Sequence, residues 1–161
     1  MAEKLPFADN SFDAVIADSV MEHVKDVECV MSEVFRVLKK DGVFYFSTAS
    51  AMYPKQSEIR FFPFFGWYPQ KVKVKIMNWA VKKKPSLVGY TEAPAINWFT
   101  PWKAERMLKN VGFKKVYGTW DVLREEEVGR KKTILKFIRL HIFTKLVADV
   151  FVPGCLYIAI K

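Results

Sequence analysis

Short apolar runs and longer amphipathic stretches alternate along the first third of the chain. Residues 12–17 (FDAVIA) are mostly apolar and partly β-branched, and the turn-like residues 8–11 (ADNS) precede them. A short apolar run bounded by a turn is typical of a strand that is buried on both faces of a parallel sheet. We therefore predict a buried parallel strand over residues 12–17.

A helix and a second strand are expected next. Between residues 24 and 40, apolar residues recur at steps of three and four, which is the pattern of an amphipathic helix. These residues are Val27, Val30, Met31, Val34, Phe35 and Leu38. Lys39 and Lys40 favour the C-terminal end of this helix, and Gly42 is suited to close it. Residues 43–48 (VFYFST) then predict a second buried strand, so the three elements form a right-handed βαβ unit.

The last third of the chain predicts further α/β elements. Thr100 and Pro101 are an N-cap and a first helical residue, and this helix should run to residue 110 and stop at Gly112. Residues 113–120 predict a strand by alternation and aromatic content, and residues 156–160 predict a final strand after the Pro-Gly turn at 153–154. The pattern as a whole indicates an α/β fold with two insertions.

The first insertion, residues 51–98, has an unusual composition. It contains RFFPFFGWYPQKVKVKIMNWAVKKKPS, in which aromatic and lysine blocks alternate between prolines. A connection of this length inside a compact domain is usually functional, for example a lid or a substrate loop. Alternatively, the aromatic residues form a satellite core of their own.

The second insertion, residues 130–151, predicts a basic amphipathic helix. Its apolar residues share one helical face, and basic residues surround them. The apolar set is Ile134, Leu135, Ile138, Ile142, Leu146 and Val150; the basic set is Arg130, Lys131, Lys132, Lys136, Arg139 and Lys145. Such a helix either lies in an anionic membrane interface or docks on the sheet with its lysines in water.

Composition narrows the function classes. The chain has 161 residues, which favours one domain over 1–161, and its net charge of +9 favours nucleic acid, anionic lipid or an acidic substrate as partner. A solvated basic surface explains the same charge. Cys29 and Cys155 are far apart, so neither a disulfide framework nor a zinc site is expected, and no metal is predicted.

The expected location is the cytoplasm. The N-terminus lacks a basic-then-apolar signal pattern, and no apolar run approaches the roughly 18 residues of a membrane span. Contact with a membrane surface is the alternative that the basic helix leaves open.

One continuous stretch resembles a known family. Residues 2–47 (AEKLPFADNSFDAVIADSVMEHVKDVECVMSEVFRVLKKDGVFYFS) contain LPF, a polar spacer, SFD, a strand, a loop ending in EH, a helix ending in RVLK, and a Gly before the next strand. This order and spacing resemble the central segment of class I S-adenosylmethionine-dependent methyltransferases, in the branch that methylates quinones, sterols, lipids and other small molecules. Residues 98–116 (WFTPWKAERMLKNVGFKKV) resemble the late helix and strand of that family more loosely.

The resemblance implies a cofactor, S-adenosylmethionine, and residues that contact it. Ala2 and Glu3 lie in the strip that contacts the adenine in relatives, and Met1 stands where relatives often have an acidic residue. Asp18, Ser19 and Val20 match the residues that leave the carboxyl end of the strand and face the methionine part of the cofactor. Asp13, from SFD, is expected to hold the turn into the strand.

His23 is the candidate for acid–base chemistry. Its unperturbed pKa of about 6.5 suits a general base or a substrate-steering group. A packed or capping histidine at the start of the helix is the alternative, because methyl transfer to a good nucleophile often needs only alignment. His141 is expected to be a packed histidine.

The resemblance also indicates what part of the family fold to expect. The chain has seven glycines and none is in a GxGxG arrangement, so the glycine-rich cofactor loop of the family is not found. The expected fold is therefore the C-terminal part of a Rossmann-like methyltransferase sheet, N-terminally truncated, with an aromatic and basic insertion and a basic amphipathic helix.

The leading functional hypothesis is methyl transfer to a hydrophobic or amphiphilic small molecule, with this chain as the C-terminal half. The candidate acceptor wall comes from the first insertion: Phe61, Phe62, Phe64, Phe65, Trp67, Tyr68 and Trp98. The alternatives are a non-catalytic remnant that pairs with a missing N-terminal half or a second copy, and a basic module that binds a membrane surface or a partner. Nucleic-acid binding has the charge and the aromatics but no recognisable motif.

Overall fold

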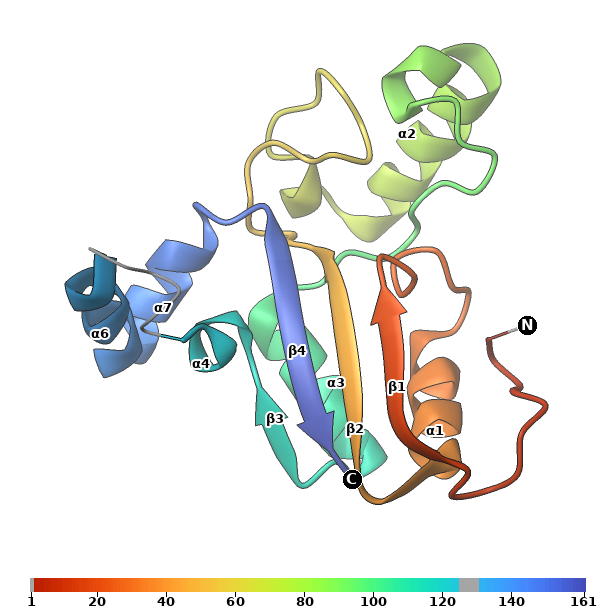
Figure 1. Cartoon of the computed structure of the whole chain (residues 1–161). Coiled ribbons are helices and arrows are strands. Elements are labelled where there is room, and N and C mark those ends of the chain that lie inside the picture. Colours follow the sequence, from red (N-terminus) through yellow and green to blue (C-terminus); the bar gives the residue numbers. More distant parts are fainter. Residues whose placement is uncertain (1, 125–130) are drawn as a thin grey trace.

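The fold is built on a mixed sheet. The structure is a computed structural model that describes residues 2–124 and 131–161, and within them four strands lie in the order β1-β2-β4-β3 (Figure 1). β1 (Phe12–Asp18) and β2 (Leu38–Ala49) are parallel, with Ile16 opposite Tyr45. β4 (Gly154–Ile160) runs antiparallel to both β2 and β3 (Lys115–Tyr117). The predicted βαβ unit and α/β class are confirmed.

The crossover helix α1 (Val27–Val37) is shorter than predicted. Asp26 caps its start, since the carboxylate accepts a hydrogen bond from the Cys29 amide at 3.0 Å. Leu38 already has an extended backbone and begins β2, so Lys39, Lys40 and Gly42 do not end the helix. The Lys39 ammonium instead pairs with the Asp13 carboxylate at 2.9 Å, which ties the starts of β1 and β2 together.

One face of the sheet carries the main core. α1 and α3 (Pro101–Val111) lie together on that face (Figure 1). The Phe44 and Phe46 rings of β2 are fully buried in this core. On β1, however, Ile16 is 72% exposed and Ala17 is the only buried residue. The prediction that residues 12–17 are buried on both faces was wrong, because the described helices cover one face of this strand.

Among the C-terminal elements, the helix α3 begins where predicted, whereas the two strands have other bounds. Thr100 is the N-cap of α3, Pro101 is its first residue, and Gly112 ends it with a left-handed φ of 119°. The predicted strand over 113–120 is too long, because β3 has three residues and Thr119–Val122 form the short helix α4. β4 begins at Gly154, two residues earlier than predicted.

Residues 51–98 form a separate layer, called the cap here, at the carboxyl ends of β1 and β2 (Figure 1). The cap contains η1 (Phe65–Trp67), α2 (Gln70–Lys83) and η2 (Pro85–Val88). It has its own apolar cluster, so the satellite-core interpretation is confirmed for part of the aromatic set. This cluster consists of Ala51, Ile59, Phe65, Met77, Ala80, Val88, Ala95 and Trp98.

The second insertion is two helices, not one. α6 (Lys132–Leu140) and α7 (Ile142–Asp149) are separated at His141, whose backbone is extended. The six apolar residues predicted to share one face are therefore divided: Leu135 is buried, whereas Ile134 is 57% and Ile142 is 79% exposed. His141 is exposed rather than packed, and Arg130 lies outside the described residues.

Candidate functional site

The LPF strip is held by two charged residues of α1. The Glu33 carboxylate accepts a hydrogen bond from the Leu5 amide at 2.8 Å and from Arg36 Nε at 2.9 Å. Arg36 also donates to the carbonyl of Phe7 at 2.9 Å and to the Asp9 carboxylate at 2.6 Å. Hydrogen bonding to Arg36, and then to the Leu5 amide, lowers the pKa of Glu33 to about 2. The RVLK helix thus fixes the strip that leads into β1.

The ends of β1 and β2 are tied together by polar contacts. Ser19, the residue after β1, has a left-handed φ of 53°, and its amide donates to the Ser47 carbonyl at 3.1 Å. The Ser47 hydroxyl in turn donates to the Asp18 carboxylate. These contacts hold the loop after Asp18 at the carboxyl end of the sheet, where ligands bind in open α/β folds.

Glu22 is the most buried acidic side chain among the described residues, with 5% of its surface exposed. Its Oε2 accepts a hydrogen bond from the Thr48 hydroxyl at 3.0 Å. Its main-chain carbonyl accepts from the amides of Ile96 and Asn97, at 2.8 and 3.0 Å. A buried carboxylate is costly without such partners. The loop that carries Glu22 is therefore clamped between β2 and the end of the cap.

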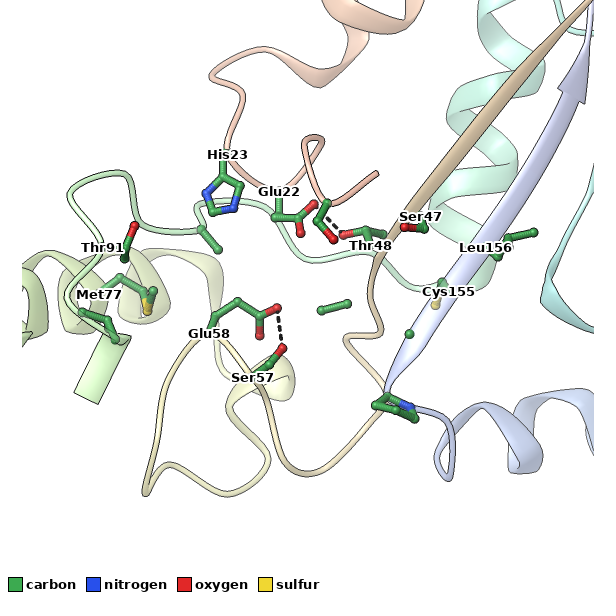
Figure 2. A pocket seen from close by; sticks show the side chains of 16 residues that line it. Glu22, His23, Ser47, Thr48, Ser57, Glu58, Met77, Thr91, Cys155 and Leu156 are labelled. Atoms are coloured by element: carbon green, nitrogen blue, oxygen red, sulfur yellow. Dashed lines mark hydrogen bonds between the residues drawn. The ribbon is translucent and has the colours of Figure 1, made fainter. Parts of the chain in front are cut away.

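A cavity of about 650 Å³ opens between this loop, the strand ends and the cap. Figure 2 shows Glu22 and His23 on one side and Ser57 and Glu58 on the other. The lining residues are Ser19, Glu22, His23, Ser47, Thr48, Ala49, Ser57, Glu58, Met77, Val88, Thr91, Ala95, Pro153, Gly154, Cys155 and Leu156. No lysine or arginine is among these described residues, although the chain carries +9 overall.

Two ionisable side chains of the cavity, Glu58 and Cys155, are in different environments. Glu58 Oε1 accepts from the Ser57 hydroxyl at 3.1 Å, while Glu58 Oε2 is buried without a hydrogen-bond partner among the described residues. Burial raises the pKa of the Cys155 thiol, which therefore stays protonated at neutral pH and is a poor nucleophile. The carboxyl groups of Glu22 and Glu58 give the cavity an acidic character.

The predicted cofactor residues divide between two places. Ser19 and His23 line the cavity, and Asp18 reaches its rim through Ser47. Val20 is exposed and is not a lining residue; its carbonyl accepts from the His23 amide at 3.0 Å. Whether these residues contact a cofactor stays a prediction.

The N-terminal pair lies elsewhere. The Glu3 carboxylate accepts from the Lys25 amide at 3.2 Å, and hydrogen bonds from the backbone, its own amide first, lower the pKa of Glu3. Ala2 packs against the main core. Both residues lie near the start of α1 rather than in the cavity, and Met1 lies outside the described residues.

The seven aromatic residues of the predicted acceptor wall are not lining residues of this cavity. Phe65 and Trp98 are buried in the cap cluster, and Phe62 and Tyr68 pack against it. Phe64 and Trp67 are exposed, and Phe61 is 89% exposed. Phe61 and Phe62 border another cavity of about 510 Å³, whose other lining residues are Pro54, Lys55, Gln56, Ile59, Arg60 and Pro63. An acceptor role for this set stays a prediction.

Sequence reasoning missed Glu22, Thr48 and Glu58. Glu22 stands beside His23 in the EH motif, and Thr48 ends the predicted second strand, so both carried a signal. Glu58 carried none, because its place depends on how the cap folds back over the strand ends.

The part of the chain that the structure describes has no cluster of metal-ligating side chains and no membrane-spanning helix. No group of three or more His, Cys, Asp or Glu side chains is placed to hold a metal ion there. None of the helices between residues 2 and 161 that the structure describes is long and apolar enough to cross a bilayer.

Known proteins resemble this chain in sequence and in fold. Residues 1–46 match a family described as a methyltransferase domain. The chain is 32% identical over 117 residues to a demethylmenaquinone methyltransferase of Symbiobacterium thermophilum, covering 70% of this chain and 45% of that protein. It is 35% identical over 127 residues to squalene methyltransferase 1 of Botryococcus braunii, covering 78% of this chain and 28% of that protein. The chain thus spans less than half the length of these curated relatives.

The fold agrees with these sequence matches. A crystal structure of an S-adenosylmethionine-dependent methyltransferase from Mesorhizobium loti superposes with a TM-score of 0.57 at 16% identity, covering 100% of this chain and 67% of that one. The sheet and its helices define a Rossmann-like α/β protein. Within that fold class, the matched motifs confirm the resemblance to class I S-adenosylmethionine-dependent methyltransferases.

Proposed function

We propose that this chain takes part in S-adenosylmethionine-dependent methyl transfer to an apolar or amphiphilic small molecule. The observation that carries the proposal is the acidic cavity at the carboxyl ends of β1 and β2, which includes both residues of the EH motif. In open α/β sheets this edge is where ligands bind. The cap closes over it, as expected for a lid or substrate segment.

The cavity suits the charge of the cofactor. S-adenosylmethionine carries a sulfonium, an ammonium and a carboxylate and is therefore a net cation, and Glu22 and Glu58 are carboxyl groups in a lining without lysine or arginine. Asp18 and Ser19 would hold the methionine part, and Ala2 and Glu3 the adenine side, as the sequence resemblance implies. The cofactor supplies an electrophilic methyl group when bound.

The residues of this chain would contribute alignment and proton handling. Methyl transfer forms a bond from the acceptor atom to the methyl carbon as the carbon–sulfur bond breaks and its electron pair stays on sulfur. Proximity is the main catalytic effect for such a displacement. His23, at the cavity wall, would accept the proton that an O–H or N–H acceptor releases.

The acceptor class is inferred from the cap and from the relatives. Met77, Val88 and Ala95 give the cap side of the cavity an apolar surface. The exposed aromatics Phe61, Phe64 and Trp67 could extend that surface outside the cavity. The relatives described above are named for demethylmenaquinone and squalene, which are both largely apolar. We extend that chemistry to this chain as a proposal.

Calorimetric titration of the purified chain with S-adenosylhomocysteine tests the cofactor site. We expect a micromolar Kd that weakens about tenfold in Glu22→Gln, since hydrogen bonds to charged groups contribute roughly 1.5–3 kcal/mol. Glu28→Gln, an exposed carboxyl in the first turn of α1, is the matched control and should bind like the wild type. No binding by a folded chain would refute a complete cofactor site in this chain.

His23→Ala separates binding from chemistry. We expect unchanged affinity for S-adenosylhomocysteine and a lower turnover with an apolar hydroxyl acceptor, because a general base contributes typically 10²–10⁴-fold. An equal loss of cofactor affinity would instead make His23 a binding residue.

A second candidate function is pairing with another polypeptide. In the described chain β1 hydrogen-bonds to β2 on one side only, and Ile16 is exposed on the face of β1 opposite to Val15 and Ala17, which contact the main core. An unpaired edge strand is a template for strand addition. A homodimer or a separate N-terminal half would fit there. Sedimentation velocity decides this: a concentration-dependent dimer that Ile16→Lys abolishes favours pairing, and a monomer at all concentrations excludes self-pairing.

A further inference from the structure

The helices α6 and α7 display apolar side chains to solvent. On α6, Ile134, Phe137 and Leu140 are each more than half exposed and recur at three-residue steps. On α7 and the turn that follows, Ile142, Phe143 and Phe151 are each at least 70% exposed, and Val147 lies between them. An exposed apolar patch of this extent usually marks an interaction site.

Polar contacts, together with the buried Leu135, attach these helices to the body. Asp149, which is buried, accepts from the Trp120 indole at 2.7 Å, and Lys145 pairs with Asp121 at 2.7 Å. The Arg139 guanidinium donates to the Trp120 carbonyl at 2.7 Å. The hydrogen bonds to α4 come from polar side chains, and apart from the buried Leu135 most large apolar side chains of α6 and α7 are exposed, whereas a docked amphipathic helix usually buries its apolar face.

The charge of this region indicates what the patch meets. Between residues 131 and 152 the sequence has Lys131, Lys132, Lys136, Arg139 and Lys145 against a single acidic residue, Asp149. Lys131 and Lys132 are exposed at the start of α6. Apolar side chains beside exposed lysines fit the interface of an anionic bilayer, where lysine meets headgroups and the apolar groups enter the acyl boundary.

We infer that α6 and α7 dock this protein on the surface of an anionic lipid bilayer. Figure 1 shows the pair on the opposite side of the sheet from the β1 edge, so docking there leaves that edge accessible. The chain leaves α7, passes the exposed Phe151 and reaches Pro153 and Gly154, which line the cavity. If the proposed function holds, a bilayer-bound protein has its cavity close to where an apolar acceptor is dissolved.

Vesicle flotation of the full chain, without cofactor or acceptor, tests the docking independently of methyl transfer. The vesicles are phosphatidylcholine alone and phosphatidylcholine with a minority of phosphatidylglycerol. We expect binding to the anionic vesicles that weakens as salt is added, because salt screens the attraction between the lysines and the lipid headgroups. Lys131→Glu with Lys132→Glu should weaken it by at least fivefold per lysine, the equivalent of about 1 kcal/mol each.

Apolar variants test the inserted face. Phe137→Ser with Phe143→Ser should lower the vesicle partition coefficient at least tenfold, because each variant removes an aromatic side chain that would leave water on insertion. Tyr90→Ser, a 74% exposed aromatic of the cap, is the matched control and should bind like the wild type. Circular dichroism of each variant checks that it folds.

Three results would overturn the inference. One is a folded wild type that does not float with anionic vesicles. Another is flotation that the serine and glutamate variants leave unchanged. The third is a dimer in sedimentation velocity that the serine pair dissociates while vesicle binding is absent, which would make the patch an interface between copies of this chain.

Discussion

Lys73 carries a buried ammonium in the cap, and its titration should be visible in the stability of the protein. The side chain of Lys73 is 5% exposed, its Nζ donates to the Gly66 carbonyl at 3.1 Å, and it lies 4.4 Å from the centre of the Trp98 ring. No carboxylate pairs with it in the described chain. Burial, followed by the positive charge of Lys103, lowers the pKa of Lys73 from 10.5 to about 8.

The sign and size of the effect follow from linkage. When the folded-state pKa lies below the unfolded one, the unfolded chain binds more protons between the two values, and the free energy of unfolding rises with pH. At pH 7 Lys73 is protonated in the folded and the unfolded state, so the folded state bears the full cost of burying the charge, about 3 kcal/mol for a pKa lowered from 10.5 to about 8. Raising the pH from about 7 to about 9.5 should increase the free energy of unfolding by about 2 kcal/mol, because Lys73 then loses its proton in the folded state.

Urea unfolding at these two pH values, followed by tryptophan fluorescence, measures the difference. Lys73→Met keeps the apolar stem and removes the ammonium, so the extra stability at the higher pH should vanish in this variant. At neutral pH the variant should be more stable by about 1–2 kcal/mol, because the lost hydrogen bond and ring contact offset part of the desolvation cost. Lys75→Met, an exposed lysine of the same helix, controls for other groups that titrate. Equal pH dependence in Lys73→Met and wild type would refute the reasoning.

Three further substitutions test separate parts of the structure. Gly66→Ala should destabilise the protein by about 3 kcal/mol in urea unfolding, because a Cβ there would clash with the Ala51 carbonyl oxygen. Asp26→Ala should cost about 1 kcal/mol through the lost N-cap of α1, and Asp26→Asn should restore most of it. Glu33→Gln should flatten the acid limb of the stability curve: the pKa of Glu33 is lowered to about 2, so its contribution is present above the ordinary pKa near 4.5 and is lost as the pH falls toward 2. An unchanged acid limb in Glu33→Gln would contradict the role given to its contacts with Leu5 and Arg36.

The hydrophobic pattern predicted the parts of the fold whose burial repeats regularly. The stripe from Val27 to Val34 faces the core as expected, and Phe44 and Phe46 alternate with half-buried neighbours along β2. Gly112 ended α3 because its left-handed backbone excludes most other residues. These signals are local, so the sequence contains them in full.

The errors arose where tertiary contacts override local preference. Lys39 and Lys40 suit a helix end. However, Leu38 pairs with Phe12 of β1, so the backbone is extended from Leu38 onward. The Lys39–Asp13 ion pair stabilises this strand pairing. Periodicity alone predicts one helix over residues 130–151. Its break at His141 is accompanied by a contact that no periodicity contains: the Thr144 hydroxyl bonds to the His141 carbonyl at 2.7 Å.

The candidate site shows the same division between local and distant signals. Ser19 and His23 could be found from their motif, but the cavity they line exists because the cap returns to the loop that holds them. The amides of Ile96 and Asn97 bond to the carbonyl of Glu22, and the Asn97 side chain donates to the Val24 carbonyl at 2.7 Å. These contacts join residues more than 70 positions apart in the chain. These hydrogen bonds hold the end of the cap to the EH loop, whereas Ser57 and Glu58, in the first part of the cap, have no such bond to that loop among the described residues, so we expect the cavity to open there.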